Sequence, residues 1–521
     1  MALTPIWPKA TDINASGALT FHGRAGAQLL DEFGSPLYLI DTDEVTERAR
    51  TFVAAAAEAF STSTTHVSFA GKAFLSKEIV RLVTAAGMLV DTCSMGEMRI
   101  ALAAGVPGRR LVLHGNNKSD EEIALAIEQG FAKIVVDSPD EPARIAAIAH
   151  RLGKRAKVML RVTCGIHAGG HEYISTAHED QKFGVPLLSA GADAAVLDVL
   201  DGLEESVISS GGAEGGAVEN DNGRALQYDL KYPYDLSHEQ LSSADKALAA
   251  AMETVADGPA LAVLKDIQSR GADLELVGIH SHIGSNIHDA DAFIQAAKRM
   301  MLLRKTFYAT DAYTLPEVDL GGGYSVAYTD GEDSMDVRVE LKRLAEAVGA
   351  INRALGMPAP AISFEPGRWI AAPAGVTLYR VGTIKPVHLT DAKDAQGNPI
   401  DERVYVSVDG GMSDNIRPAL YAADYTARLA NREGAPETKL SRVVGMHCES
   451  GDIVVRECPL PADIARGDIL AVPVTGAYGR TMASNYNQAP IPAVVAVSES
   501  GAHVMLRRQT IDDLLALDVS E

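Results

Sequence analysis

Residues 66–92, HVSFAGKAFLSKEIVRLVTAAGMLVDT, contain one complete unit of the pattern that decides the fold. A short apolar run, Val67–Ala70, precedes residues 77–86, where apolar side chains recur every three or four positions, and a second apolar run follows at Met88–Asp91. Short apolar runs are typical of buried parallel strands, and the three-to-four spacing is typical of an amphipathic helix. Gly87 is a common kind of helix end. The stretch therefore predicts a strand, a helix and a second strand.

The same unit recurs along the chain and predicts eight strands that alternate with helices. Eight such units are the number in a TIM barrel, whereas a doubly wound open sheet, the alternative, has about six strands. We therefore expect a barrel. The predicted strands are Val67–Ala70, Met88–Asp91, Leu111–His114, Ile134–Asp137, Val158–Val162, Leu274–His280, Val318–Leu320 and Ile362–Glu365, and the predicted helices include Lys77–Ala86, Met95–Ala104, Asp120–Gln129, Glu141–Leu152 and Ala292–Thr306.

The pattern changes after Arg368, where short β-rich runs separated by turn residues predict an all-β domain. Residues 36–40 are also strand-like and are expected to join this domain, because chain termini often lie close together. We thus expect a barrel over 45–373 and a β-sandwich or β-barrel domain built from 1–44 and 374–521.

An insertion is expected near residues 190–260, because the fifth and sixth strands lie too far apart for one unit. Within it, Leu200–Arg224 carries six acidic residues and one basic residue, which favours a solvated surface segment. A helix is expected there over Ala244–Ala256.

Composition limits the function classes. The 521 residues have a formal net charge of −22, which disfavours nonspecific binding to nucleic acid or to an anionic membrane. Hydrophobic residues make up 47%, enough for a folded core. The four cysteines form no C-x-x-C pair, and there is neither a signal-peptide pattern nor an apolar run of membrane-helix length. We expect a soluble, cytoplasmic protein with reduced thiols and no nucleic-acid or membrane partner.

Polar residues and glycines follow each predicted strand, where TIM barrels hold their active sites. Lys72 follows the first strand, and in a partly desolvated barrel mouth it would have a lowered pKa and could bond to a carbonyl group. An ordinary solvated lysine is the alternative. Gly321, Gly322 and Gly323 follow the seventh strand and would let backbone N–H groups approach an anion, or form a simple turn.

The eighth strand is followed by Glu365, Gly367 and Arg368. Arg368 suits the same anion, and Glu365 would either pair with a protonated pyridine nitrogen or form an ion pair with Arg368. His280 and His282 alternate on the sixth strand and would share one face. With no further ligands apparent, a stacking or hydrogen-bonding role for His282 is favoured over a metal site.

Cys448 and Glu449 lie together in the β-rich region. A cysteine beside a glutamate could donate a proton, although a buried structural cysteine is the alternative.

Seven motifs, in order and spanning nearly the whole chain, resemble those of the diaminopimelate decarboxylase family. This family belongs to the pyridoxal-phosphate (PLP) enzymes of alanine-racemase-like fold that include ornithine and arginine decarboxylases. The matching stretches are Ala70–Ala73, His280–Ser285, Asp319–Tyr324, Glu365–Arg368, Asn415–Tyr421, Cys448–Ser450 and Gly476–Tyr478.

The resemblance implies a role for each matching residue. Lys72 would hold PLP covalently, His282 would stack on its ring, and Glu365 would keep the ring nitrogen protonated. Cys448 would act near the substrate's α-carbon and Glu449 would hold its distal amino group, both from the neighbouring subunit, so a homodimer is implied. The residues implied around the cofactor phosphate or its edge are Ser285, Gly321, Gly322, Gly323, Gly367, Arg368 and Tyr478, and those implied in substrate binding are Arg368, Arg417, Tyr421, Glu449 and Tyr478.

The implied activity is decarboxylation of meso-2,6-diaminopimelate to L-lysine and CO2, the last step of lysine biosynthesis. Arg417 favours a second carboxylate on the substrate, whereas an ornithine-type enzyme binds a distal ammonium with acids. The alternatives are a decarboxylase of another diamino acid, an alanine-type racemase, and a PLP-binding homologue without catalysis. No metal is expected.

Overall fold

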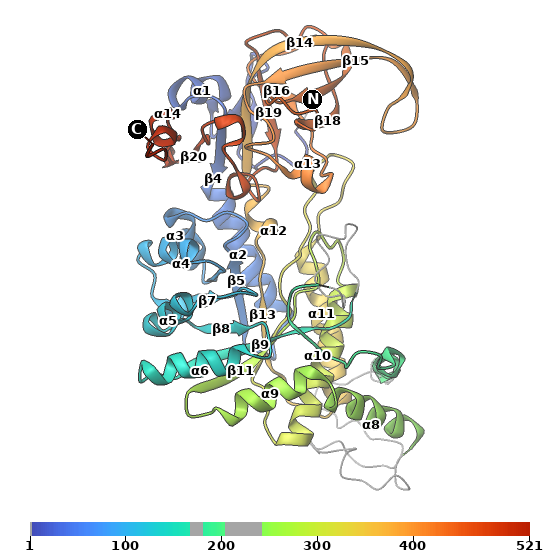
Figure 1. Ribbon diagram of the computed structural model, residues 1–521. Helices are drawn as coiled ribbons and strands as arrows, with labels where there is room; N and C mark the ends of the chain where they lie inside the picture. The colour runs from blue at the N-terminus through green and yellow to red at the C-terminus, as the bar shows by residue number, and fades with distance from the viewer. Residues whose placement is uncertain (1–2, 167–180, 204–241, 521) are drawn as a thin grey trace.

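The computed structural model describes residues 3–166, 181–203 and 242–520. It contains a closed barrel of parallel strands with helices outside, and a second large sheet beyond one end of the barrel (Figure 1). Closure depends on β8 (Lys133–Val136), which pairs with β9 (Ala156–Thr163) and so joins the two ends of the sheet. The predicted TIM barrel is therefore confirmed, and the open doubly wound sheet is wrong.

The barrel strands follow chain order around the ring, and each predicted strand is present with its ends within two residues of the prediction. Short apolar runs mark these strands clearly because both faces of a parallel barrel strand are buried. The strands are β5 (Thr65–Ala70), β6 (Leu89–Thr92), β7 (Leu111–Leu113), β8, β9, β11 (Leu274–His280), β12 (Glu317–Asp319) and β13 (Ala361–Phe364), and β10 (Val185–Pro186) pairs with β9 outside the ring.

Four helices of the barrel region, α2, α9, α11 and the short α12, are not among the predicted ones. The predicted helix over Ala244–Ala256 is present as α8, whereas most of the acid-rich stretch Leu200–Arg224 lies outside the described residues. The helices of the barrel region are α2 (Thr42–Ala59), α3 (Lys77–Ala85), α4 (Met95–Ala103), α5 (Asp120–Gln129), α6 (Glu141–Arg151), α8 (Ser243–Ala256), α9 (Pro259–Ser269), α10 (Asp291–Asp311), α11 (Val337–Ala354) and α12 (Arg368–Ala371).

Side-chain caps set where the helices begin and keep the strand-end loops short. The Ser76 hydroxyl accepts a hydrogen bond from the backbone N–H of Ile79 at 3.1 Å, which starts α3. Ser119 and Glu122 form a reciprocal capping box at the start of α5. Lys72 therefore lies in a loop of six residues between β5 and α3, at the carboxyl end of the barrel.

The second large sheet runs in the order β18-β17-β15-β14-β4-β20-β21, and most of its pairs are antiparallel. Strand β4 (Leu37–Asp41) lies inside it, antiparallel to β14 and parallel to β20, so the prediction that residues 36–40 join the C-terminal strands is confirmed. The other strands are β14 (Gly375–Lys393), β15 (Pro399–Val408), β17 (Thr438–Val444), β18 (Ile453–Pro461), β20 (Ala493–Ser498) and β21 (Gly501–Leu506), with β16 (Arg428–Leu429) and β19 (Ile469–Pro473) paired at its side.

The remaining elements are small. A three-stranded sheet and α1 precede β4, α13 follows β15, and α14 lies near the C-terminus (Figure 1). Among the described residues, no single helix is long and apolar enough to cross a membrane, and one pair, α8 with α9, meets the length and composition criteria only when taken together, bent by 64°. The bounds are β1 (Thr11–Ile13), β2 (Leu19–Phe21), β3 (Arg24–Ala25), α1 (Gly26–Phe33), α13 (Arg417–Tyr421) and α14 (Ile511–Leu515).

Candidate active site

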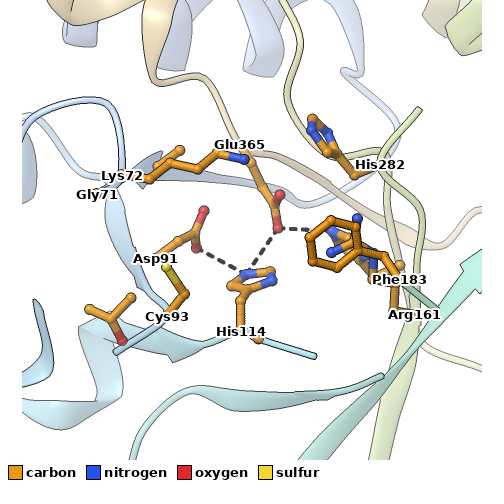
Figure 2. A pocket seen from close by; sticks show the side chains of 13 residues that line it. Gly71, Lys72, Asp91, Cys93, His114, Arg161, Phe183, His282 and Glu365 are labelled. Carbon is orange, nitrogen blue, oxygen red and sulfur yellow. Dashed lines mark ion pairs between the residues drawn. The ribbon is translucent and has the colours of Figure 1, made fainter. Parts of the chain in front are cut away.

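A pocket opens at the carboxyl ends of the barrel strands, as the positions of the polar residues predict (Figure 2). Lys72 is exposed within it, in the loop after β5, and its neighbours come from five other strand ends. The pocket is lined by Ala70, Gly71, Lys72, Asp91, Thr92, Cys93, His114, Gly115, Arg161, Phe183, His280, His282 and Glu365.

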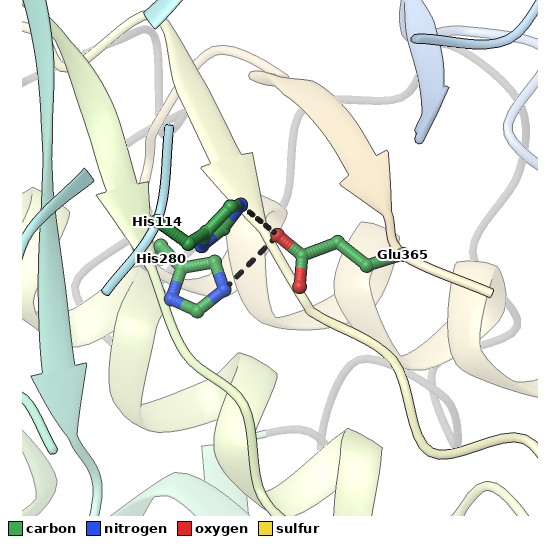
Figure 3. A group of neighbouring side chains, drawn as sticks. All are labelled: His114, His280 and Glu365. Carbon is green, nitrogen blue, oxygen red and sulfur yellow. Dashed lines mark ion pairs between the residues drawn. The ribbon is translucent and has the colours of Figure 1, made fainter. Parts of the chain in front are cut away.

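Glu365 lies between two histidines at the base of this pocket (Figure 3). Its Oε1 atom is 3.2 Å from Nε2 of His114 and 3.2 Å from Nε2 of His280, and His114 is also 3.5 Å from Oδ1 of Asp91. Burial acts to raise the pKa of Glu365, but His280 and His114 outweigh it and hold the pKa well below its usual value. Glu365 is therefore a carboxylate.

His114 carries the complementary positive charge. Burial acts to lower the pKa of His114, but Glu365 and Asp91 outweigh it and raise the pKa to about 10. Burial and the negative charge of Glu365 raise the pKa of Asp91 to about 6. At neutral pH the floor of the pocket is thus a row of alternating charges: the Asp91 carboxylate, the His114 cation and the Glu365 carboxylate.

The floor of the pocket fits a pyridine ring with a protonated nitrogen. Oε1 of Glu365 is buried, and although it has two ion-pair neighbours it accepts no hydrogen bond of good geometry from the described residues. A buried, charged carboxylate oxygen that accepts no other hydrogen bond is a strong acceptor for a ring N–H. The Glu365–Arg368 ion pair, the alternative from the sequence, is not among the ion pairs of the described residues, because Arg368 points to Ser285 and Tyr328.

His282 is a half-buried, neutral imidazole. Burial lowers its pKa well below the usual value, and the nearby positive charge of Lys72 lowers it further. Its Nδ1 atom accepts a hydrogen bond from the backbone N–H of Gly322 at 3.2 Å. β11 ends at His280, so His282 lies just beyond the strand, but both side chains line the pocket around Lys72. His280 points to Glu365, while His282 lies beside the glycine loop.

The glycine loop and Arg368 form a second cavity next to Lys72. A Cβ atom on Gly322 would lie 2.4 Å from the carbonyl oxygen of Glu365, so no other residue fits there without displacing the backbone. Arg368 donates from Nη2 to the Ser285 hydroxyl at 2.7 Å. The cavity is lined by Ala70, Lys72, His282, Ser285, Gly322, Gly323, Tyr324, Glu365, Gly367, Arg368 and Tyr478. Gly321 is not among the lining residues; its N–H donates to Oδ1 of Asp319 at 3.0 Å.

Arg417 and Tyr421 line a wider cavity that also contains Lys72 and Arg368. The Arg417 guanidinium is 7% exposed and lies 4.4 Å from the centre of the Tyr328 ring, and it donates to the Tyr425 hydroxyl. A buried guanidinium with aromatic and hydroxyl neighbours, and no carboxylate partner among the described residues, is a receptor for an anionic group.

Cys448 and Glu449 lie away from these cavities. They occupy the turn between β17 and β18, Cys448 is an exposed free thiol, and neither residue is among those that line the pockets around Lys72. The site of a single chain therefore brings together Lys72, the glycine loop and Arg417, but not the cysteine and glutamate.

Sequence reasoning assigned no role to His114, Phe183, Tyr328 or Tyr425. The signal for His114 was present, since it stands directly at the end of a predicted strand. The three aromatic residues carry no such signal, because they lie in loops outside the quoted motifs.

Known proteins resemble this chain over nearly its whole length. A family model described as pyridoxal-dependent decarboxylase, pyridoxal binding domain, matches residues 43–204 and 256–372. The diaminopimelate decarboxylase of Corynebacterium efficiens is 39% identical over 99% of this chain and 94% of its own, and that of Bacillus subtilis is 33% identical over 97% and 96%. A solved diaminopimelate decarboxylase from M. jannaschii, in complex with L-lysine, matches with a TM-score of 0.73 and 26% identity over 99% of this chain and 98% of its own. The chain belongs to the diaminopimelate decarboxylase family of PLP-dependent decarboxylases.

Proposed function

We propose that the protein decarboxylates meso-2,6-diaminopimelate to L-lysine and CO2, the last step of lysine biosynthesis. The observation that carries this proposal is that Lys72 and the buried Arg417 line one cavity. An amine that can bind a cofactor aldehyde and a guanidinium that can bind a distal carboxylate are therefore available to one substrate molecule.

PLP supplies an electron-accepting ring that stabilises the charge left on the α-carbon when CO2 departs. Residues of the chain bind the cofactor, keep its ring nitrogen protonated and pack against its ring. Lys72 binds the cofactor through its amine, and Glu365 holds a proton at the ring nitrogen by its carboxylate oxygen. His282, which is neutral, packs against the ring without adding charge.

The glycine loop and Arg368 are proposed to hold the cofactor phosphate. Ser285, Gly322, Gly323, Gly367, Arg368 and Tyr478 all line the small cavity beside Lys72 and supply N–H, hydroxyl and guanidinium donors. Gly321 supports this loop through its hydrogen bond to Asp319.

The distal end of the substrate is proposed to bind Arg417 and Tyr421, with Arg368 and Tyr478 nearby. Because Arg417 lacks a carboxylate partner among the described residues, a substrate that brings its own carboxylate satisfies the charge. A substrate with only a distal ammonium, such as ornithine, would place two cations together. This difference favours diaminopimelate over ornithine or arginine.

We further propose a homodimer in which Cys448 and Glu449 enter the partner's pocket. The support is that both residues lie away from the pockets of their own chain and that the Cys448 thiol is exposed. In the partner's site Cys448 would return a proton to the α-carbon, a step for which the Lys72 amine is the alternative donor, and Glu449 would hold the distal ammonium.

Two smaller proposals complete the assignment. The family match over 43–204 and 256–372 supports a division into a barrel domain, 45–373, and a β domain made of 1–44 and 374–521. The four free cysteines support a reducing, cytoplasmic location.

The test is an assay of the purified protein with PLP and meso-diaminopimelate, followed by measurement of lysine and CO2. We expect both products in equal amounts, and no comparable release of CO2 from ornithine or arginine. Racemisation of alanine without CO2 would indicate the racemase, and bound PLP without turnover of any of these substrates would indicate the non-catalytic homologue.

A further inference from the structure

The turn that carries Cys448 is anchored by a side chain from a distant segment. The backbone N–H of Cys448 donates to Oδ1 of Asn487 at 3.2 Å. The same oxygen lies 3.2 Å from Nδ1 of His447, the residue before Cys448. One amide oxygen therefore contacts both the peptide of the cysteine and the side chain that precedes it.

The chemistry of these contacts defines the protonation of His447. The amide atom that faces the N–H of Cys448 must be the oxygen, because the amide nitrogen is a donor. Since that oxygen only accepts, Nδ1 of His447 carries a proton and donates to it. The Nε2 atom of His447 lies within hydrogen-bond distance, 2.7 Å, of the Ser413 hydroxyl. Both His447 and Ser413 are buried, at 8% and 6% exposure, so the chain of hydrogen bonds is shielded from water.

The peptide of His447, next to that of Cys448, is also held by a side chain. The backbone N–H of His447 donates to Oδ2 of Asp452 at 2.7 Å, and the N–H of Met412 donates to Oδ1 of the same carboxylate at 2.6 Å. Two consecutive peptides, those of His447 and Cys448, are thus fixed by side chains, while the Cys448 thiol stays exposed.

The backbone of Asn487 has an uncommon conformation. Its φ is +50°, in the left-handed region, where asparagine is one of the few side chains found regularly. A residue in this conformation persists when surrounding structure stabilises it, and such residues cluster at functional sites.

We propose that Asn487 is a positioning residue that orients Cys448 for its reaction in the partner's site, with His447 and Ser413 as its support. The inference rests on the proposed function, in which Cys448 returns a proton to the substrate of the neighbouring subunit. Proton transfer requires a donor within about 2.6–3.2 Å of the acceptor, and a misplacement of about 1 Å can cost about 100-fold in rate. Asn487 therefore acts on the site whose Lys72 belongs to the other chain.

The first experiment compares two substitutions in the holoenzyme. Asn487→Gly removes the side chain but leaves the left-handed backbone unstrained, whereas Asn487→Asp keeps an acceptor oxygen at the same place. We expect Asn487→Gly to lower kcat about tenfold with KM changed less than about twofold, and Asn487→Asp to retain at least about half of kcat. Bound-cofactor absorbance is expected to stay unchanged in both.

The matched control is Asn485→Ala in the same turn. Asn485 donates to the Ala489 carbonyl at 2.8 Å and to Gln509 at 2.6 Å, and within the described part of the chain it forms no hydrogen bond with Cys448. We expect a lower melting temperature without a selective loss of kcat. A kcat for Asn487→Gly that equals wild type, or that falls only as far as that of Asn485→Ala, would overturn the proposal.

The second experiment separates this inference from the proposed function. Chains with Lys72→Ala are mixed and reassociated with chains carrying either Cys448→Ala or Asn487→Gly. Random pairing makes half of the dimers mixed, each with one native site, so activity should recover to about a quarter of wild type for both pairs.

Each result has a separate meaning. If the Cys448→Ala pair fails to recover, the shared active site is wrong and the inference falls with it. If that pair recovers but the Asn487→Gly pair does not, the shared site stands and Asn487 acts in the pocket of its own chain, against our proposal.

Discussion

Replacing His114 by glutamine should destabilise the protein in a pH-dependent way, because this histidine is the cation between two buried acids. Its pKa is raised from 6.5 to about 10, and since one pKa unit corresponds to 1.36 kcal/mol, the shift corresponds to about 5 kcal/mol of stability. In His114→Gln the carboxylates of Asp91 and Glu365 face each other without this charge. Loss of one partner of a buried ion pair typically costs about 3–5 kcal/mol, which agrees with the shift.

The sign of the pH dependence follows from the raised pKa. The contribution of His114 is complete below pH 6.5, where the unfolded chain is also protonated, and it is lost as the pH rises through about 10. The difference in unfolding free energy between wild type and His114→Gln should therefore be larger at neutral pH than at pH 9 and should decrease as the pH rises toward about 10.

The assay is urea unfolding of the apoenzyme, followed by circular dichroism at pH 6, 7, 8 and 9. His150→Gln is the matched control, since His150 also pairs with an aspartate, Asp273 at 3.2 Å, but is 81% exposed at its side chain. It should change the unfolding free energy by less than about 0.5 kcal/mol. A difference for His114→Gln below about 1 kcal/mol at pH 7 would refute the assignment of a cationic His114.

Three further substitutions test the site directly. Lys72→Ala should abolish both activity and the absorbance of lysine-bound PLP, and a retained absorbance would show that another residue anchors the cofactor. Arg417→Ala should raise KM for diaminopimelate about 100-fold or more while PLP affinity, measured by titration of the apoenzyme, changes less than about threefold; equal losses would make Arg417 a structural residue. Gly322→Ala should lower PLP affinity at least about tenfold, because the added Cβ would lie 2.4 Å from the Glu365 carbonyl oxygen, and unchanged affinity would exclude the glycine loop from cofactor binding.

The sequence predicts the barrel well because its strands are buried on both faces and so appear as continuous apolar runs. The helices are less evenly marked. Helix α2 contains the run Ala54–Ala57, in which alanine favours a helix but gives little contrast between an apolar and a polar face. Helix α9 begins at the end of the expected insertion near residues 190–260 and continues beyond it to Ser269, and it buries five apolar side chains.

Several residues of the candidate site can be predicted from the sequence, but their contacts cannot. Lys72 and Glu365 are visible at strand ends, and the motifs identify the family. The contacts of Glu365 with His114 and His280 are not visible, because they join β7, β11 and β13, which come together only when the ring closes. The environment of Arg417 is equally hidden, since Tyr328 and Tyr425 reach it from separate loops.

The place of β4 has a consequence for synthesis of the chain. This strand is made early, yet its neighbours β14 and β20 are made hundreds of residues later, after every strand of the barrel. Domains generally fold as units while the ribosome is still adding residues. The barrel can therefore form during translation, whereas β4 must wait without its sheet partners until β14 and then β20 have been made.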